Sequence, residues 1–165
     1  MKSKIKLFLI VASLGWMSSS IKAQAIDGTE LRNTTMELIP ELDLQNKILF
    51  VNLWKSDDLE SRENNKEFLR VSNIYKQGKL KNGTSGVAYI NLCLDNELYN
   101  WIVSVKKDGI ESPFNLENSS QKYKALIKYF DGKTGNIVIG NDGSIIGENL
   151  KKDDCFILFR SLITR

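Results

Sequence analysis

Histidine is absent from the 165-residue chain, and cysteine and proline occur only twice each. Without histidine, the usual general base near neutral pH and the commonest zinc ligand are missing. Nucleophile pairs of serine or cysteine with histidine are therefore excluded. The two cysteines, Cys93 and Cys155, are too few for a thiolate metal site or a dense disulfide framework. We therefore expect the protein to hold neither a metal ion nor a cofactor.

Apolar runs as long as the roughly 20 residues of a membrane span are also missing. The first apolar run, at 7–17, follows lysines at positions 2, 4 and 6 and precedes Ala23. This arrangement is typical of a secretory signal peptide at residues 1–23, with cleavage after Ala23. The alternative is an uncleaved N-terminal anchor. We expect cleavage, which gives a soluble product that begins at Gln24 in the periplasm or outside the cell.

The predicted signal peptide contributes four basic residues and no acidic one. Without it, 19 basic residues face 20 acidic residues, so the formal charge changes from +3 to −1. No basic patch then indicates nucleic acid or an anionic surface as a partner. About 142 residues remain, which is enough for one domain with a single core.

The strongest structural signal lies at 48–54, where an apolar run of β-branched and aromatic residues predicts a strand buried on both faces. Asp57 and Glu60 follow with the spacing of a capping box, which predicts a helix at about 58–77. The apolar face of this helix is formed by Phe68, Leu69, Val71, Ser72 and Tyr75. A strand that leads into a helix N-terminus at the edge of a sheet is a common place for chemistry.

Weaker patterns define the rest of the chain. Residues 24–46 are predicted to form an N-terminal arm with one short strand. Further strands are predicted at 87–94, 136–140 and 144–147, and helices at 98–107, from a cap at Ser119 or Ser120 to Phe130, and from a cap at Asp153 or Asp154 onward. The sequence Asn141-Asp-Gly143 marks a hairpin turn. This order predicts an α/β fold in which a mixed central sheet contains a parallel βαβ unit and a C-terminal β-hairpin plus helix.

Five pieces of the sequence, in this order, are similar to a known family: Asn52-Leu-Trp-Lys-Ser56, Arg62-Glu63, Ile90-Asn-Leu-Cys-Leu-Asp95 before Trp101, Lys106-Lys-Asp-Gly109 and the segment Ile137 to Ile146. Together they resemble the thioredoxin-like proteins of the TlpA and AhpC/TSA (redoxin) group, in the extracytoplasmic form common in Bacteroidetes. The resemblance covers the predicted domain at 47–165 and implies a thioredoxin-like fold.

The family acts through a Cys-x-x-Cys motif at a helix N-terminus, which faces a cis-proline. The resemblance places the motif at Asp58, Leu59, Glu60 and Ser61. It places the cis-proline at Thr134, and therefore implies that both halves of the redox site are missing. A carboxylate cannot form a mixed disulfide. We accordingly expect a binding or accessory module without catalysis, with an unknown envelope protein as its partner.

Other interpretations remain open. The protein is alternatively a thiol-disulfide oxidoreductase or an antioxidant redoxin that uses Cys93 and Cys155, or a folded relic without a partner. The two cysteines are interpreted first as inert core thiols, second as a structural disulfide and last as a redox pair. The acids at 57, 58 and 60 are interpreted as helix caps rather than as an acid–base or cation site. Trp54 and Trp101 are interpreted as core residues rather than as the lining of a ligand pocket.

Overall fold

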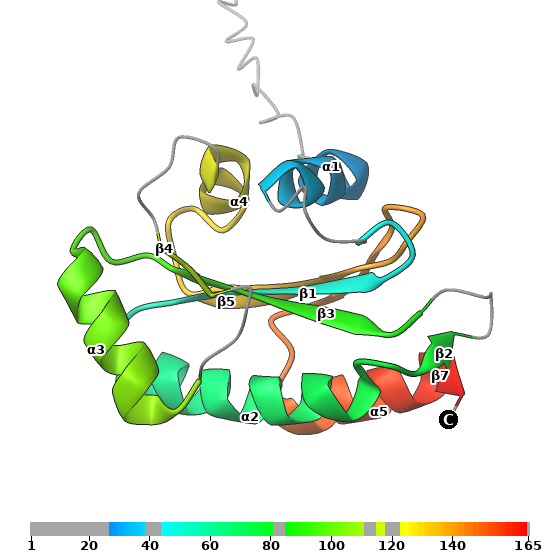
Figure 1. The fold of residues 1–165 in the computed structure, drawn as a ribbon. Helices are drawn as coiled ribbons and strands as arrows, with labels where there is room; N and C mark the ends of the chain where they lie inside the picture. The colour runs from blue at the N-terminus through cyan, green and yellow to red at the C-terminus, as the bar shows by residue number, and fades with distance from the viewer. Residues whose placement is uncertain (1–26, 39–43, 81–84, 111–114, 118–122, 165) are drawn as a thin grey trace, which may run out of the picture.

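The protein is described by a computed structural model, which covers residues 27–38, 44–80, 85–110, 115–117 and 123–164. The elements in chain order are α1 (Gly28–Leu38), β1 (Ile48–Trp54), α2 (Leu59–Tyr75), β2 (Lys79–Leu80), β3 (Val87–Cys93), α3 (Leu98–Asp108), β4 (Asn115–Glu117), α4 (Lys124–Tyr129), β5 (Gly135–Ile139), β6 (Ile145–Glu148), α5 (Lys152–Leu162) and β7 (Ile163–Thr164). Helices lie on both sides of a central sheet, with α1 and α4 on one face and α2 and α5 on the other (Figure 1).

The central sheet has five strands in the order β4-β3-β1-β5-β6. Strand β1 pairs in parallel with β3 and antiparallel with β5, so it lies in the middle of a mixed sheet. The parallel βαβ unit and the hairpin of β5 and β6 are therefore confirmed. All four predicted strands lie within one residue of the observed bounds. A separate two-stranded sheet joins β2 to β7 and was not predicted.

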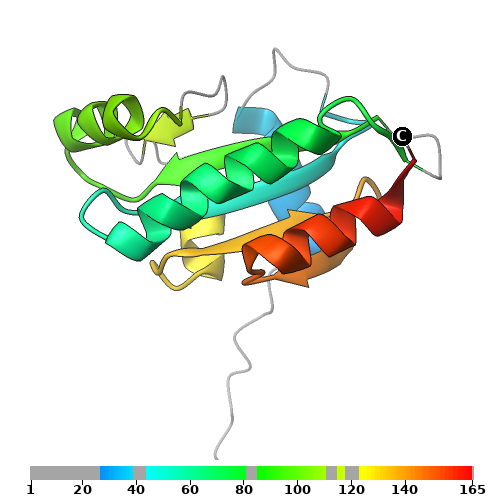
Figure 2. The ribbon, with the colours of Figure 1, turned by 90° about the horizontal axis from the view of Figure 1, so that it is seen from below.

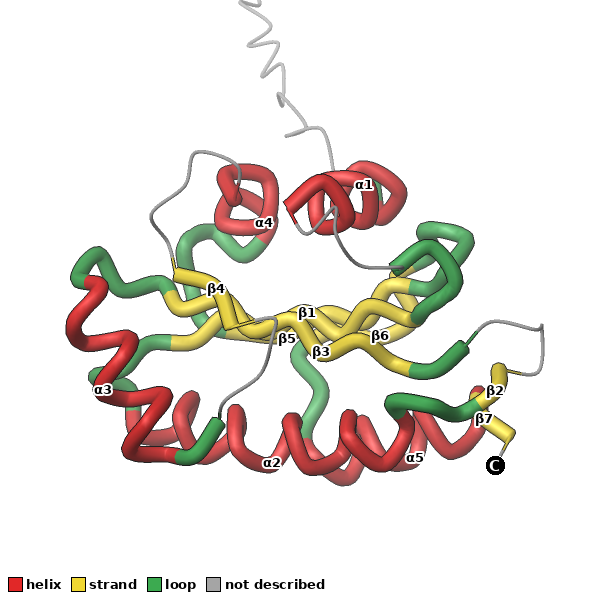
Figure 3. Tube along the Cα trace, viewed as in Figure 1, coloured by secondary structure: helices red, strands yellow, loops and turns green. Residues whose placement is uncertain are grey.

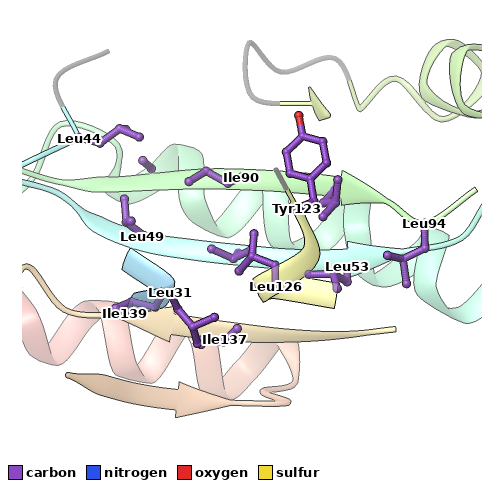
Figure 4. Packing of buried hydrophobic residues seen from close by; sticks show 13 residues of the cluster. Leu31, Leu44, Leu49, Leu53, Ile90, Leu94, Tyr123, Leu126, Ile137 and Ile139 are labelled. Carbon is purple, nitrogen blue, oxygen red and sulfur yellow. The ribbon is translucent and has the colours of Figure 1, made fainter. Parts of the chain in front are cut away.

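Each face of the sheet carries its own hydrophobic core. Figure 3 shows the helices that cover the two faces. Toward α1 and α4, alternate residues of the central strands pack against Leu31 and Leu126, as Figure 4 shows. Toward α2 and α5, Phe50 lies at the centre of an aromatic group. Its ring centroid is 5.1 Å from that of Phe68, 5.2 Å from that of Tyr89 and 5.4 Å from that of Phe159. The contacts with Phe68 and Phe159 are edge-to-face and the contact with Tyr89 is tilted. Aromatic contacts of this kind add to the free energy gained from apolar burial.

The arm at 24–46, predicted to contain one short strand, forms the helix α1 at Gly28–Leu38, and none of its other described residues forms a strand. This helix packs on the sheet through the fully buried Leu31, so it belongs to the same core as the rest of the domain. Strand β4, which pairs with β3, was not predicted either. Both segments are weakly patterned, and tertiary contacts decide their structure.

One predicted helix start also needs correction. Helix α5 begins at Lys152 after Lys151, and Asp154 is inside the helix, where its carboxylate accepts a hydrogen bond from the Lys151 N–H. Helix α4 spans only Lys124–Tyr129. The caps proposed for it at 119 and 120 lie outside the described residues. The hairpin turn at Asn141-Asp-Gly143 is confirmed: Gly143 has φ +85°, and Asp142 accepts hydrogen bonds from the N–H and hydroxyl of Ser144.

Arg32 fastens α1 to the sheet. Its guanidinium is buried and donates hydrogen bonds of 2.8 to 3.0 Å to four backbone carbonyls, those of Leu44, Gln45, Lys47 and Gly140. Burial lowers the pKa of this group, and the charge of Asp142 opposes that effect. The contacts tie together α1, the chain that leads into β1 and the turn of the hairpin.

We expect Arg32→Ala to lower the free energy of unfolding by about 2–4 kcal/mol, because four carbonyl groups lose a charged donor in a buried place. Urea denaturation measures this change. The matched control is Arg70→Ala on α2, whose side chain is largely exposed and pairs with Glu67. Surface pairs contribute little, so the control should change stability much less. Equal effects of the two substitutions would contradict the role given to Arg32.

Candidate functional site

The turn between β1 and α2 is built by Asp58 and Ser61. Asp58 is the N-cap of α2, with extended backbone angles, and its carboxylate accepts a hydrogen bond of 3.1 Å from the Ser61 N–H. The predicted cap, Asp57, is therefore wrong by one residue. An N-cap carboxylate both satisfies a free N–H group and lies at the positive end of the helix dipole. The capping interpretation of this acid is confirmed for Asp58.

Ser61 closes the turn from inside. Its side chain is buried, and its hydroxyl lies 3.2 Å from the carbonyl oxygen of Lys55 and 3.0 Å from that of Asp58. The same hydroxyl accepts a hydrogen bond of 3.3 Å from the Lys55 N–H. The two residues between Asp58 and Ser61, which are Leu59 and Glu60, are exposed. Of these four residues, two hold the backbone and two face the solvent.

A pocket of about 510 Å³ opens between the N-terminal turns of α2 and α5. Figure 2 shows these two helices side by side, with both N-termini at the same end of the sheet. The wall on the α2 side includes Asp58, Glu60 and Ser61, and the opposite wall includes Thr134. The full lining is Asn52, Leu53, Asp58, Glu60, Ser61, Asn64, Phe68, Thr134, Gly135, Asn136, Asn149, Leu150, Lys151, Lys152 and Asp153.

The structure thus brings together three of the predicted site residues and Thr134, from segments more than 70 residues apart. Leu59 does not line the pocket. Sequence reasoning missed the contribution of α5, whose first residues supply two lysines and one aspartate. No local pattern in the sequence relates those residues to Asp58, because only the sheet order brings the start of α5 next to the start of α2.

Two of the residues that line the pocket, Asn52 and Asn136, belong to a row of four asparagines that crosses the sheet. Asn115 on β4, Asn91 on β3, Asn52 on β1 and Asn136 on β5 are neighbours in the strand pairing. Asn52 donates to the Asn91 side-chain oxygen at 3.2 Å, and Asn91 donates to that of Asn115 at 2.9 Å. Asn136 instead exchanges two hydrogen bonds with the backbone of Leu150 before α5. Buried amides are stable only when they are bonded in this way.

The charges around the pocket are mixed. Asp58, Glu60 and Asp153 face Lys151 and Lys152. Lys152 also pairs with Glu67 at 2.9 Å, and this hydrogen bond lowers the pKa of the Glu67 carboxyl. Such a lining suits a polar ligand or a protein segment that offers both donors and acceptors, and it does not favour a simple anion or cation.

A partly buried ion pair fixes α3 to α2. The guanidinium of Arg62 makes two hydrogen bonds of 2.6 Å to the carboxylate of Asp108, and Lys66 lies 3.6 Å from the same carboxylate. The hydrogen bond from Arg62 lowers the pKa of Asp108. Bidentate pairs of this kind are geometrically specific. Two of the family-like pieces of the sequence, those at 62–63 and 106–109, therefore meet in space.

Both cysteines are free and fully buried, and neither lines the pocket. Cys93 packs with Trp54 and Val105, whereas Cys155 belongs to the separate aromatic core around Phe50. Burial raises the pKa of each thiol to about 12. A thiol must lose its proton to act as a nucleophile, so these environments oppose redox chemistry.

The remaining candidates have structural explanations. Trp54 is fully buried, and Trp101 packs against the same cluster, so both belong to the core. Within the part of the chain that the structure describes, no three potential metal-binding side chains lie together. The helices in that part are also too short or too polar to cross a membrane.

No family model matches the sequence, and no curated protein is significantly similar to it. Solved structures are similar in fold. The thioredoxin domain of a thiol-disulfide oxidoreductase from Bacteroides vulgatus aligns with TM-score 0.60 and 16% identity over 72% of this chain and 81% of that chain. A thioredoxin-like protein from Parabacteroides distasonis aligns with TM-score 0.57 and 19% identity over 72% of this chain and 83% of that chain. A secreted disulfide oxidoreductase from Mycobacterium tuberculosis aligns with TM-score 0.54 and 12% identity over 72% and 84%.

These comparisons establish the fold. The chain has the thioredoxin-like fold of these oxidoreductases, as the resemblance at 47–165 implied. The five-stranded mixed sheet and its covering helices agree with that assignment.

The raised thiol pKa values have a consequence for stability. In the unfolded chain both thiols lose their protons near pH 8.5, whereas the folded protein retains them until about pH 12. The folded state then binds more protons, so stability should fall as pH rises above 8.5, by about 1.4 kcal/mol per pH unit for each thiol. Urea denaturation between pH 7 and about 9.5 measures this slope.

The control for this experiment is the double variant Cys93→Ala and Cys155→Ala. Its absolute stability should be lower, because two buried sulfur atoms leave small cavities. Its stability should nevertheless change little over the same alkaline range. An equally steep decrease in the double variant would show that other groups are responsible.

Proposed function

We propose that this thioredoxin-fold protein is an exported binding or accessory module of the cell envelope that does not catalyse thiol-disulfide exchange. The main support is the chemistry at the start of α2. The residues there are Asp58, Leu59, Glu60 and Ser61, and the first and last of them hold the backbone of the turn. The nearby pocket wall carries Thr134 where the family resemblance expects a cis-proline.

Export is part of the proposal. It rests on the signal-like pattern at 1–23, with cleavage after Ala23, and these residues lie outside the described part of the structure. A secreted disulfide oxidoreductase among the similar structures agrees with it. Intact-mass measurement of the periplasmic or secreted fraction tests it. A mass that begins at Gln24 is expected, and a membrane-bound product that retains residues 1–23 would contradict it.

The alternative function is a TlpA-like oxidoreductase or an antioxidant redoxin that uses Cys93 and Cys155. The family likeness favours this alternative, but the environment of the two thiols does not. They lie in different cores, both are inaccessible, and burial raises both pKa values to about 12. Exchange enzymes need an exposed thiolate of low pKa.

Restoring the motif separates the two possibilities. The wild type should not reduce insulin above a cysteine-free control. The double variant Asp58→Cys and Ser61→Cys should fold, with a loss of about 1–2 kcal/mol from the lost cap and the Ser61 hydrogen bonds. It should form an internal disulfide and reduce insulin weakly, and the further change Thr134→Pro should improve its rate.

The matched control is the double variant Asp57→Cys and Glu60→Cys, which has the same Cys-x-x-Cys spacing one residue earlier in the chain. These thiols lie off the N-cap position and should gain less from the helix dipole. Insulin reduction by the wild type that disappears in Cys93→Ser or Cys155→Ser would contradict the proposal and support the alternative.

Binding is tested with a pair of asparagines on α2. Asn64 is exposed and lines the pocket, whereas Asn73 is exposed on the same helix and does not. Cross-linking and co-purification from the native cells should capture the same envelope protein with the wild type and with Asn73→Trp. The bulky side chain of Asn64→Trp should abolish that capture. Equal capture by both variants would place the interaction elsewhere.

A further inference from the structure

Another pocket, of about 500 Å³, lies between the C-terminal turns of α2 and α5. It is lined by Tyr75 on α2, by Phe156 and Arg160 on α5, and by Ile163 on β7. The candidate site described above lies between the N-terminal turns of the same two helices. Figure 2 shows α2 and α5 side by side, with β7 following the end of α5. We call this second hollow the Arg160 pocket.

Three of the four lining side chains are apolar or aromatic and belong to the core. Tyr75 and Ile163 are buried, and Phe156 is partly buried. The ring of Tyr75 makes edge-to-face contacts with those of Phe156 and Phe159, at centroid distances of 6.0 and 5.9 Å. Strand β7 is held by its pairing with β2. The apolar wall is therefore preformed, so a ligand loses little free energy in ordering it.

Arg160 supplies the charge of the pocket. The residue is exposed, and among the described residues its side chain makes neither an ion pair nor a hydrogen bond. Arg62 and Arg70 differ in this respect, because they pair with Asp108 and Glu67. A cation in the last turn of a helix stabilises the helix dipole. That role still leaves the N–H donors of the Arg160 guanidinium available to a ligand.

The segments that form the pocket are basic. Residues 68–94 and 155–165 contain lysine and arginine but neither aspartate nor glutamate. The acid that precedes the first segment, Glu67, is paired with Lys152. The acid that precedes the second, Asp154, accepts a hydrogen bond from the backbone at the start of α5. A local positive charge therefore exists here, although the formal charge of the predicted mature chain is −1.

We propose that the Arg160 pocket binds a small carboxylate with an apolar body, of the class of medium-chain aliphatic acids. The guanidinium pairs with the carboxylate, a geometry that allows two parallel hydrogen bonds. The apolar body lies against Tyr75 and Phe156. Small-molecule sites commonly have volumes of about 300–1,000 Å³, apolar walls and few polar groups. The lining matches a ligand that is both apolar and anionic, and it does not match a cation.

The affinity should be modest, because water competes for an exposed guanidinium. For octanoate, a small member of the class, we expect a dissociation constant of about 0.1–1 mM. The inference does not depend on the proposed function, because the two pockets share no lining residue. Each can therefore fail without the other.

Isothermal titration calorimetry with sodium octanoate tests the inference. Octanoate should bind at least about tenfold more tightly than acetate, which lacks the apolar body, and than octylamine, which carries the opposite charge. NMR locates the ligand: the amide signals of Tyr75 and Ile163 should shift, and that of Thr134 in the candidate site should not. No binding of octanoate at about 10 mM, or equal binding of octylamine, would overturn the inference.

Substitution of the arginine tests the role of its charge. Arg160→Gln should fold, because the residue is exposed, and should weaken octanoate binding at least about tenfold. Arg70→Gln is the matched control, since Arg70 is an exposed arginine on α2 that does not line the pocket. Arg160→Glu should lose octanoate and bind octylamine instead, because the charge is reversed.

Cosedimentation with vesicles of anionic phospholipid distinguishes a free ligand from a membrane surface. The wild type should stay in the supernatant. Equal effects of Arg160→Gln and Arg70→Gln on octanoate binding would overturn the inference. Binding to the vesicles without binding of octanoate would also overturn it and would assign the basic segments to a lipid surface.

Discussion

Strand β1 is the constraint on which the rest of the structure depends. All seven of its residues are buried, and it is hydrogen-bonded to a strand on each side. One face of the strand must fill the core below α1 and α4, while the other must fill the core above α2 and α5. Helix α2 also follows the carboxyl end of this strand, so the position of β1 determines where the candidate pocket lies.

The N-terminal helix α1 is stabilised by tertiary contacts rather than by the helix propensity of its sequence. Its sequence contains two threonines and an asparagine in succession, which are poor helix formers. Leu31 and Arg32 compensate by tertiary contacts, one through apolar burial and the other through four carbonyl groups. Because a guanidinium carries five N–H donors, one arginine can fix several chain segments at once through their carbonyl groups.

The sequence was sufficient to predict helices and strands where the pattern of apolar residues is local and long. The apolar run at 48–54 and the periodic face of α2 predicted their elements closely, and the order of five short pieces predicted the fold. The sequence was insufficient to identify the N-cap of α2, because the adjacent Asp57 and Asp58 both suit a cap. Only the backbone geometry and the hydrogen bond from the Ser61 N–H identify Asp58 as the cap. The sequence did not predict strand β4, because pairing with β3 determines that strand. It also did not place the first turn of α5 at the pocket, because proximity to α2 determines that position.

The asparagine row has a consequence for folding. A shift of one residue between two strands exchanges the two faces, so side chains of the core toward α1 and α4 would enter the core toward α2 and α5. A shift of two residues preserves the faces, and apolar patterning alone would tolerate it. Such a shift would place Asn52 opposite Tyr89 or Cys93 instead of Asn91, and would leave a buried amide without its partner. The asparagine row therefore favours the native register over two-residue shifts, which apolar patterning alone does not distinguish.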